Sequence, residues 1–565
     1  MRRFWTSQSR KEQSSARRKW VLRASVGTLA VVVVGGAAAV VWLAWPRMSL
    51  HPGSGALAQI GSFEAGHVVS AQASFGSKTV SLVDRGGSIT PVAALPQGTK
   101  LRLVVDIREP WWMSWATGAN RVVTATVITP QASLVDPVVV AAPGQPVAAR
   151  FSRPVRKIEV ISGTADPVET LKRPSAKVDL VRSVQAGQVG DLEVSAAPDT
   201  WESLRPPVAL SYFGSAGSSV PMMLAQPPLA EGAVPVSSSI SLSFSQPVAS
   251  VFDNRMPTIT PVLKGAPTPA GHWSEPTPYS LEFVPDGPSF WPGESLTLDL
   301  PDPVAPVSTT PSGASSAPAD PTTSIPFSGV GGSVLRLQQL LAGLGYLPLD
   351  WSAAPGSLAA SAASDTEAAQ AALMTTSPPG SFAWRWNLPS PLTSLWQPGV
   401  DNVITDGAIM TFEQVSHLNT VGISNPLLWP TLIDAYLAHR TDPHEYTWIE
   451  VSKNLPETLT FYRNGAVALR SLANTGIAQA PTAAGTYPVY LRLAFQIMRG
   501  HNPDGSAYAD PVHWINYFNG SDAVHGFVRA SYGFPQSVGC VELPVPVAAQ
   551  LWPMVHIGTL VTVLP

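Results

Sequence analysis

A run of 22 residues without one charged side chain, residues 24–45, constrains this 565-residue chain more than any other feature. As a helix it spans about 33 Å, which matches the hydrocarbon core of a bilayer. The preceding residues 1–23 carry eight basic side chains against one acid, Glu12, and such a basic flank stays on the cytoplasmic side. We therefore expect a cytoplasmic tail at 1–23, a single transmembrane helix at 24–45, and the remainder of the chain outside the cell membrane.

The alternative is a cleaved secretory signal peptide, whose apolar core normally spans roughly 7–15 residues. The longer run favours an uncleaved anchor. Ala56-Leu-Ala58 has the pattern of a cleavage site but lies well beyond the run. Both interpretations export the chain. The exported part has more acids than bases, so it does not have the basic face of a nucleic-acid-binding protein.

Two β-rich domains are expected after the membrane segment. With 56 prolines and 13% charged residues, the composition is typical of extracellular β modules joined by stiff linkers. Residues 48–205 predict the first domain, because turn residues recur at the spacing of short strands. Residues 206–305 predict the second, where Phe244-Ser-Gln-Pro-Val248 repeats Phe151-Ser-Arg-Pro-Val155. The repeat resembles bacterial immunoglobulin-like modules, which implies two β-sandwiches; one larger irregular β domain is the alternative.

A linker and a group of helices follow. Residues 306–329 are mostly Pro, Ser, Thr and Ala, which predicts a semi-rigid linker. A helix is expected behind Ser333, a favourable N-cap. Residues 407–413 and 429–433 resemble the second and third helices of a known small helical domain. Residues 352–381 are rich in Ala, Ser and Pro, and we expect them to be disordered. The apolar side chains of the first helix share one face: Val334, Leu337, Leu341 and Leu344.

These three helical segments together resemble the small peptidoglycan-binding-like domain. The resemblance implies a helical domain at residues 330–440, interrupted by the disordered insert. Such a domain binds the cell wall or serves as a rigid spacer, and both roles stay open at this point.

The last part of the chain, residues 446–565, predicts a mainly β domain. Asn464-Gly465 has the sequence of a tight hairpin turn between two strands. A short helix is expected at 547–552. The expected strands cover residues 448–452, 458–462, 466–470, 486–490 and 555–563.

The only cysteine of the chain, Cys540, lies in this domain. A single thiol forms no internal disulfide, so it is an inert small hydrophobe, a metal ligand or a nucleophile. Zinc binding would use His501, His513 or His525 with Cys540, but the chain has no closely spaced ligand pair of the kind zinc sites use. A nucleophile needs a base and backbone N–H donors near the thiol.

The residues around Cys540 favour the nucleophile. His525-Gly526 lies fifteen residues upstream, and Ser537-Val538-Gly539 precedes the thiol directly. Cys540 is expected to attack a peptide carbonyl as a thiolate, while His525 takes the thiol proton and returns it to the leaving amine. The backbone N–H groups of Gly539 and Cys540 are the candidate oxyanion donors. Ser537 is expected to hold the loop through a hydrogen bond.

The ordered set of motifs resembles the catalytic domain of the L,D-transpeptidases, exported cysteine enzymes that cross-link peptidoglycan. It covers residues 446–565. The resemblance adds four candidate substrate-binding residues: Gly526, Trp514, Tyr517 and Glu542. The matching motifs are Asn474-Thr-Gly476, Pro481-Thr-Ala-Ala-Gly485, Asp510-Pro-Val-His-Trp514, Tyr517-Phe518, His525-Gly526 and Ser537-Val-Gly-Cys540.

Two positions depart from the family pattern. Val538 stands where the family often has His, so side-chain help from that position is absent. Glu542 stands where the family often has Arg or Asn. An anionic Glu542 is expected to repel a substrate carboxylate and to favour an amine, which implies an altered stem or acceptor preference.

We therefore expect a multidomain enzyme: a transmembrane helix, β-sandwich modules, a small helical domain and a C-terminal mainly β L,D-transpeptidase domain. The resemblance implies that its partner is a peptidoglycan stem tetrapeptide cut after the third residue, with D-alanine leaving and the side-chain amine of another stem accepting. No cofactor or metal is implied, because cysteine chemistry needs none. Two alternatives remain: a carboxypeptidase or endopeptidase that uses water as acceptor, and a non-catalytic wall-binding protein that keeps the fold.

Overall fold

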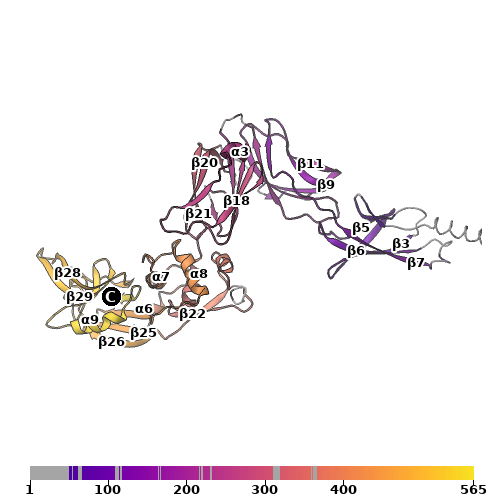
Figure 1. The fold of residues 1–565 in the computed structure, drawn as a ribbon. Coiled ribbons are helices and arrows are strands. Elements are labelled where there is room, and N and C mark those ends of the chain that lie inside the picture. The colour runs from indigo at the N-terminus through magenta and orange to yellow at the C-terminus, as the bar shows by residue number, and fades with distance from the viewer. Residues whose placement is uncertain are drawn as a thin grey trace, which may run out of the picture. The chain divides into compact units, whose positions relative to one another are not determined.

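The computed structural model describes most of the chain after residue 49 (Figure 1). The expected tail and transmembrane helix, residues 1–45, lie outside the described residues. No helix within the described part is long and apolar enough to cross a membrane. The described residues are 50–565, except 54, 61–66, 109–113, 115–117, 163, 166, 216, 218–219, 230–231, 309–317, 358 and 360–364.

The chain is multidomain and mostly β, and it divides into two compact units. The first unit consists of Met1–Pro137, Ala148–Val181 and Leu192–Leu210. The second consists of Val138–Val147, Arg182–Asp191 and Ser211–Pro565.

The first unit contains a seven-stranded antiparallel sheet in the order β1-β2-β5-β4-β3-β6-β7. Strand β6 (Lys100–Arg108) explains how the sheet buries one face, because its buried side chains Leu101, Leu103, Val105 and Ile107 fall at alternate positions. Trp201 packs into the same core. The other strands are β1 (Leu50–Gly53), β2 (Ala56–Ile60), β3 (His67–Phe75), β4 (Lys78–Arg85), β5 (Ser88–Pro91) and β7 (Asn120–Ile128).

A second group of strands continues the β-rich region. Strand β9 (Val147–Ser162) pairs with β10 (Thr164–Ala165), β11 (Glu169–Val181) and β12 (Val189–Ala197). The described residues from Leu50 to Ala197 are therefore rich in strands, whereas the domain bounds 48–205 and the immunoglobulin-like character stay predictions.

The next β domain lies in the second unit and is built on an eight-stranded sheet. Phe244, the first residue of the repeated sequence, is fully buried and meets Phe252 edge-to-face at 5.3 Å. Its elements are β14 (Met222–Gln226), β15 (Ala233–Val234), β16 (Ile240–Phe244), α3 (Val248–Phe252), β17 (Thr258–Pro261), β18 (Gly271–Thr277), β19 (Ser280–Pro285), β20 (Ser295–Val307) and β21 (Thr322–Gly329). Outside this eight-stranded sheet, β8 (Val138–Ala141) pairs in parallel with β13 (Val208–Gly214).

The predicted linker at 306–329 is wrong for its last residues. Residues Thr322–Gly329 form β21, which pairs antiparallel with β20 and places Ile325 opposite Leu298. Ile325 and Phe327 are both buried in the core of this domain. Two large apolar side chains at alternate positions are enough to fix a strand against a core, even in a stretch dominated by small and polar residues.

The helical domain has the three helices that the sequence predicts. Helix α4 (Val334–Gly343) begins at Ser333, whose hydroxyl oxygen accepts a hydrogen bond from the N–H of Arg336 at 3.3 Å. The later helices are α7 (Val403–Val415) and α8 (Leu428–Leu437). A short helix α6 (Ser390–Thr393) lies between them and α4 in the sequence.

The insert at 352–381 was expected to be disordered, and this is wrong for much of it. Strand β22 (Leu349–Ala353) pairs antiparallel with β23 (Gly380–Trp384). Helix α5 (Glu367–Ala372) starts at Thr366, whose hydroxyl caps the N–H of Ala369. Met374 is fully buried in the core of the helical domain. The buried side chains that follow the Ala/Ser-rich stretch explain why it folds.

The C-terminal domain combines a five-stranded sheet in the order β26-β25-β24-β32-β27 with a four-stranded sheet in the order β28-β29-β30-β31 (Figure 1, yellow). The predicted hairpin turn is confirmed, since Asn464 and Gly465 both have positive φ angles of 47° and 78°. Helix α9 (Val545–Leu551) packs on the second sheet. The strands are β24 (Thr447–Ser452), β25 (Thr458–Arg463), β26 (Ala466–Leu472), β27 (Gly485–Pro488), β28 (Leu491–His501), β29 (Ala507–Asn519), β30 (Asp522–Gly526), β31 (Val541–Leu543) and β32 (Leu560–Val563).

The last strand is shorter than the predicted 555–563. The N–H of Thr559 bonds to the carbonyl of His556 at 3.1 Å, and Gly558 has a φ of 89°. This turn ends at Thr559, so that only Leu560–Val563 pairs with β24 and β27.

Candidate active site

Cys540 and His525 lie in the wall of one cavity with a volume of about 360 Å³. His525 belongs to β30, and Cys540 stands directly before β31. The two strands are parallel neighbours, with His525 opposite Glu542. This register brings together a histidine and a cysteine that are fifteen residues apart in the sequence.

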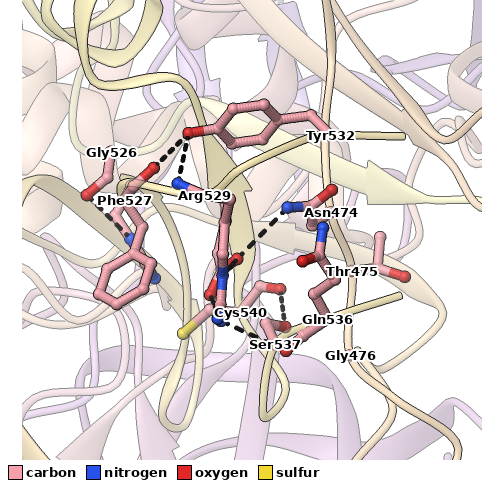
Figure 2. A network of polar contacts seen from close by, with 12 residues as sticks. Asn474, Thr475, Gly476, Gly526, Phe527, Arg529, Tyr532, Gln536, Ser537 and Cys540 are labelled. Carbon is pink, nitrogen blue, oxygen red and sulfur yellow. Dashed lines mark hydrogen bonds and ion pairs between the residues drawn. The ribbon is translucent and has the colours of Figure 1, made fainter. Parts of the chain in front are cut away.

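The loop before Cys540 is fixed by two hydrogen bonds that the carbonyl oxygen of Cys540 accepts. The Ser537 hydroxyl donates to that oxygen at 2.5 Å, and the Thr482 hydroxyl donates to it at 3.4 Å. The N–H of Ser537 bonds to the carbonyl of Thr475 at 3.0 Å, and Gly476 forms a bridge to Ser537 (Figure 2). Ser537 therefore has the loop-holding contact that the sequence predicted for it.

The backbone of Gly539 shows why a glycine precedes Cys540. Its φ is 103°, which side chains other than glycine rarely adopt. A Cβ at this position would lie 2.6 Å from a carboxylate oxygen of Asp522. In the part of the chain that the structure describes, the N–H groups of Gly539 and Cys540 have no acceptor, so they are available as oxyanion donors.

The thiol and the imidazole are both neutral in the resting site. The pKa of the Cys540 thiol is raised to about 12, mainly by burial; the N–H of Ala523 opposes the rise by stabilising the thiolate, and the negative charges of Asp522 and Glu542 add to it. Burial lowers the pKa of the His525 imidazole, and Glu542 only partly offsets this.

The tautomer of His525 follows from its partner. Nδ1 lies 3.4 Å from the carbonyl oxygen of Gly526, and a carbonyl can only accept, so Nδ1 carries the proton. Nε2 is then left with its lone pair, which is the form a general base needs.

Arg529 and Glu542 form a bidentate ion pair in the same cavity wall. The Arg529 Nε donates to one carboxylate oxygen at 2.8 Å, and Nη2 donates to the other at 2.7 Å. The Asn474 amide lies 3.5 Å from the same carboxylate, and Tyr532 accepts the N–H of Arg529 at 3.1 Å. Figure 2 shows the Arg529 side chain running from Tyr532 toward Cys540.

The four predicted substrate-binding residues lie in different environments. Glu542 is in the cavity wall but is buried and neutralised by Arg529, so it presents no isolated negative charge. Tyr517 packs beside Cys540 and donates its hydroxyl proton to the Gln496 amide oxygen at 2.8 Å. These placements leave their contacts with substrate as predictions.

Trp514 and Gly526 do not line the cavity that holds the thiol. The Trp514 ring packs toward Trp552, with centroids 5.8 Å apart, and its φ of 59° makes a bulge in β29. A Cβ on Gly526 would lie 3.0 Å from the Ala548 Cβ, so this glycine lets α9 approach β30. Packing, rather than contact with a ligand, explains both residues in this structure.

Several residues of the cavity wall were not named as candidate site residues from the sequence. One signal is visible once β29 is known: Tyr508, Asp510 and Val512 occupy alternate positions and therefore point to one face of the strand. The other members depend on the hairpin register and on loop packing, which the sequence does not reveal. The added wall residues are Met498, Asn502, Tyr508, Asp510, Val512, Phe527, Arg529, Gln536 and Val538.

The alternative of a zinc site gains no geometric support from these residues. His513 is exposed and meets Phe495 in a tilted arrangement with ring centroids 5.0 Å apart, and His501 is exposed at the end of β28. Among the described residues, no group of three or more His, Cys, Asp or Glu side chains is placed to hold a metal ion.

Comparison with known proteins identifies the domain that holds this cavity. Residues 446–563 match the family model of the L,D-transpeptidase catalytic domain. No curated protein matches the chain in a sequence search. The assignment therefore rests on the family model, which contains the whole cavity wall.

Solved structures of such domains share part of the sequence. The catalytic domain of the Enterococcus faecium L,D-transpeptidase acylated by ertapenem is 30% identical, covering 21% of this chain and 98% of that one, with a TM-score of 0.20. Another structure of that catalytic domain is 29% identical, covering 22% and 99%, with a TM-score of 0.20. An L,D-transpeptidase from Mycobacterium smegmatis is 15% identical, covering 60% and 97%, with a TM-score of 0.20. The C-terminal domain of this chain belongs to the L,D-transpeptidase catalytic domain family, and the chain is an L,D-transpeptidase enzyme.

Proposed function

We propose that this protein is a membrane-anchored peptidoglycan L,D-transpeptidase that forms cross-links through an acyl-enzyme on Cys540. The observation that carries the proposal is the presence of Cys540 and His525, on neighbouring parallel strands, in the wall of one cavity within the matched domain. A peptidoglycan substrate follows from the family, whereas the anchor and the acyl-enzyme belong to the proposal.

The acylation half-reaction uses the neutral groups of the resting site. His525 Nε2 takes the proton of the Cys540 thiol as the sulfur attacks the carbonyl of the third stem residue. The N–H groups of Gly539 and Cys540 stabilise the oxyanion. His525 then gives its proton to the departing amine of D-alanine, which leaves a thioester and a neutral imidazole.

The second half-reaction regenerates the enzyme. The side-chain amine of a second stem attacks the thioester carbonyl, and His525 takes the proton that the amine loses. The C–S bond breaks as the new amide forms, and the Cys540 sulfur recovers its proton from His525. Water in place of the amine gives a carboxypeptidase with the same residues, so the product separates the two.

The remaining domains serve the catalytic domain in this proposal. The apolar run at 24–45 holds the protein in the cytoplasmic membrane, with the N-terminus inside and the catalytic domain in the cell wall space. The β modules space the catalytic domain from the membrane, and the helical domain at 330–440 presents the peptidoglycan strand.

The test is intact-mass analysis of the full chain, purified in detergent and mixed with a disaccharide tetrapeptide, beside the Cys540→Ala variant. An acyl adduct on the native chain alone, together with a dimeric muropeptide, supports transpeptidation. An adduct that yields tripeptide without dimer, even with excess acceptor, points to hydrolysis. A folded native chain that forms no adduct overturns the catalytic proposal and leaves a wall-binding or spacer protein.

A further inference from the structure

The charges in the cavity wall are unevenly placed. Arg529 is the single arginine or lysine among the described residues that line the cavity, and the acids there are Asp510 and Glu542. His525 is neutral because burial lowers its pKa. An anionic group that enters this cavity therefore meets one fixed cation.

The ion pair with Glu542 does not use all the N–H donors of the Arg529 guanidinium. The Glu542 carboxylate takes the Nε and Nη2 edge of the guanidinium at 2.8 and 2.7 Å. Nη2 also donates to the Gln536 carbonyl at 3.3 Å. Nη1 has no partner among the described residues, so two N–H donors stay unused on the far edge of the fork.

The guanidinium is also held in a fixed orientation. It lies over the Phe527 ring at 4.7 Å, and the side chain is 30% exposed, which leaves it accessible from the cavity. Its partner Glu542 is buried, paired with His525 across two strands, and only two residues beyond Cys540. The arginine comes from the loop after β30 rather than from β31, the strand after the cysteine. Figure 2 shows Arg529 near Phe527 and Cys540.

The proposed donor carries one anion at a fixed distance from the reacting carbonyl. In a tetrapeptide cut after its third residue, the terminal carboxylate lies a single residue beyond the bond that breaks. One residue spans at most about 3.6 Å, so the partner of this carboxylate has to lie in the cavity that holds the thiol. A fifth residue would move the carboxylate away, and amidation would remove its charge.

We propose that Arg529 is a specificity residue that binds the terminal carboxylate of the donor stem through its free Nη1 edge, and that Glu542 is the positioning residue that holds the guanidinium there. This inference rests on the proposed function. It changes the interpretation of Glu542: the carboxylate does not select an amine, but orients an arginine that selects an acid. Asp510 would repel a misplaced carboxylate, which sharpens the selection.

The test uses two donors that differ only at the terminus: the disaccharide tetrapeptide with a free D-alanine carboxylate and the same compound with a terminal carboxamide. The acylation rate of the full chain is measured by intact mass for each. We expect the native protein to prefer the acid about tenfold or more, as for a hydrogen bond to a charged group. Arg529→Gln should lose this preference through slower reaction with the acid, while the amide reacts as before.

Three variants complete the design. Arg463→Gln removes an exposed arginine, ion-paired with Glu445 at 3.4 Å, that does not line the cavity, and it should keep the native preference. Glu542→Gln should give an intermediate preference, because the guanidinium remains but is held less firmly. If Arg529→Gln fails to fold because Glu542 is left buried and unpaired, Arg529→Gln/Glu542→Gln removes both charges and should fold without the preference.

The outcomes separate this inference from the proposed function. Equal rates of the native protein with both donors, or an unchanged preference in Arg529→Gln, overturn the role of Arg529 while acylation itself stands. If neither donor acylates the native protein, the binding of both compounds to the Cys540→Ala chain is measured by calorimetry. Tighter binding of the acid that is lost in Cys540→Ala/Arg529→Gln supports the role of Arg529, and equal binding overturns it.

Discussion

Burial acts in opposite directions on the two central residues of the site. It raises the pKa of the Cys540 thiol to about 12 and lowers that of the His525 imidazole, so neither carries its charge near pH 7. A preformed thiolate–imidazolium pair is therefore not the resting state. The neutral imidazole is nevertheless the active form of a general base, and proton transfer can accompany attack on a bound substrate.

This electrostatic state predicts two different pH profiles. Alkylation of Cys540 by iodoacetamide, which needs the thiolate, should be slow at pH 7 and rise steadily with pH toward about 12. Acylation by the donor should be constant around pH 7 and fall only below pH 6.5, the ordinary imidazole value, because the pKa of His525 is lowered. Rates measured between pH 5 and 10 check both. Fast alkylation at pH 6 would contradict the neutral resting pair.

Asp522 contributes to the raised pKa of Cys540 through its charge. Its carboxylate is also the group that forces glycine at position 539. The Asp522→Asn substitution should therefore lower the thiol pKa and speed alkylation at pH 8 several-fold. Asp504→Asn, in the exposed turn of the β28–β29 hairpin, should leave the rate unchanged. An Asp522→Asn protein that is folded and alkylates at the native rate would show that the charge has no such effect.

At the scale of elements, the hairpin β28–β29 builds much of the cavity wall, and of its wall residues only Asp510 and Val512 belong to a matched motif. Tyr508 and Asp510 reach the cavity because β29 alternates and because its register with β28 is set by ten paired positions. The loop before Cys540, by contrast, was partly predictable. The bond from the Ser537 hydroxyl to the carbonyl of Cys540 is local, and His525 belongs to a matched motif, whereas the contacts of Ser537 with Thr475 and Gly476 join distant segments.

Arg529 marks the limit of prediction at this scale. The sequence shows an acid at position 542 but not its partner, since the ion pair joins a strand to a loop thirteen residues upstream. The same limit explains β21 and the folded insert. Short apolar patterns such as Ile325 and Phe327 become informative only when the core they complete is known.

The finding that Thr322–Gly329 form strand β21, and are not the end of a linker, can be tested directly. The Phe327 ring is buried and meets Phe290 edge-to-face at 5.9 Å. Phe327→Ala should cost about 3–5 kcal/mol in the domain that contains it, and the amides of β20 and β21 should lose hydrogen-exchange protection. Ser324→Ala, on the same strand with an exposed side chain, should have little effect. Equal hydrogen-exchange protection in both variants would mean that residues 322–329 belong to a linker and not to the domain core.

At the scale of the molecule, the helical and catalytic domains of the second unit share one core. Trp448 and Leu560 of the catalytic domain lie in the same buried cluster as Leu432 of α8. The Thr411 hydroxyl of α7 donates to the carbonyl of Ile557 at 3.0 Å. The sequence suggested a boundary near residue 440, but a continuous core makes the two domains mechanically dependent.

The shared core predicts coupled unfolding. Leu432→Ala should cost about 2–5 kcal/mol through the cavity it leaves, and it should lower the temperature at which donor acylation is lost, although Leu432 is not in the cavity wall. The matched change is Asp434→Ala in the same helix, which removes an exposed ion pair with Arg440 and should shift this temperature little. Unchanged heat inactivation in Leu432→Ala would mean that the domains unfold independently.

The membrane anchor is the prediction that sets where the enzyme works. Residues 24–45 have the length and the basic flank of a transmembrane helix. The full chain expressed in a bacterium should therefore stay with the membrane after carbonate washing, and added protease should digest the catalytic domain in spheroplasts but leave the N-terminal tail. A chain in which 24–45 is replaced by a cleavable signal peptide should be found in the soluble exported fraction. N-terminal sequencing decides against the anchor if the native mature chain begins shortly after Ala58. The apolar run is then a cleaved signal peptide, and the β modules do not hold the catalytic domain at a distance from the membrane.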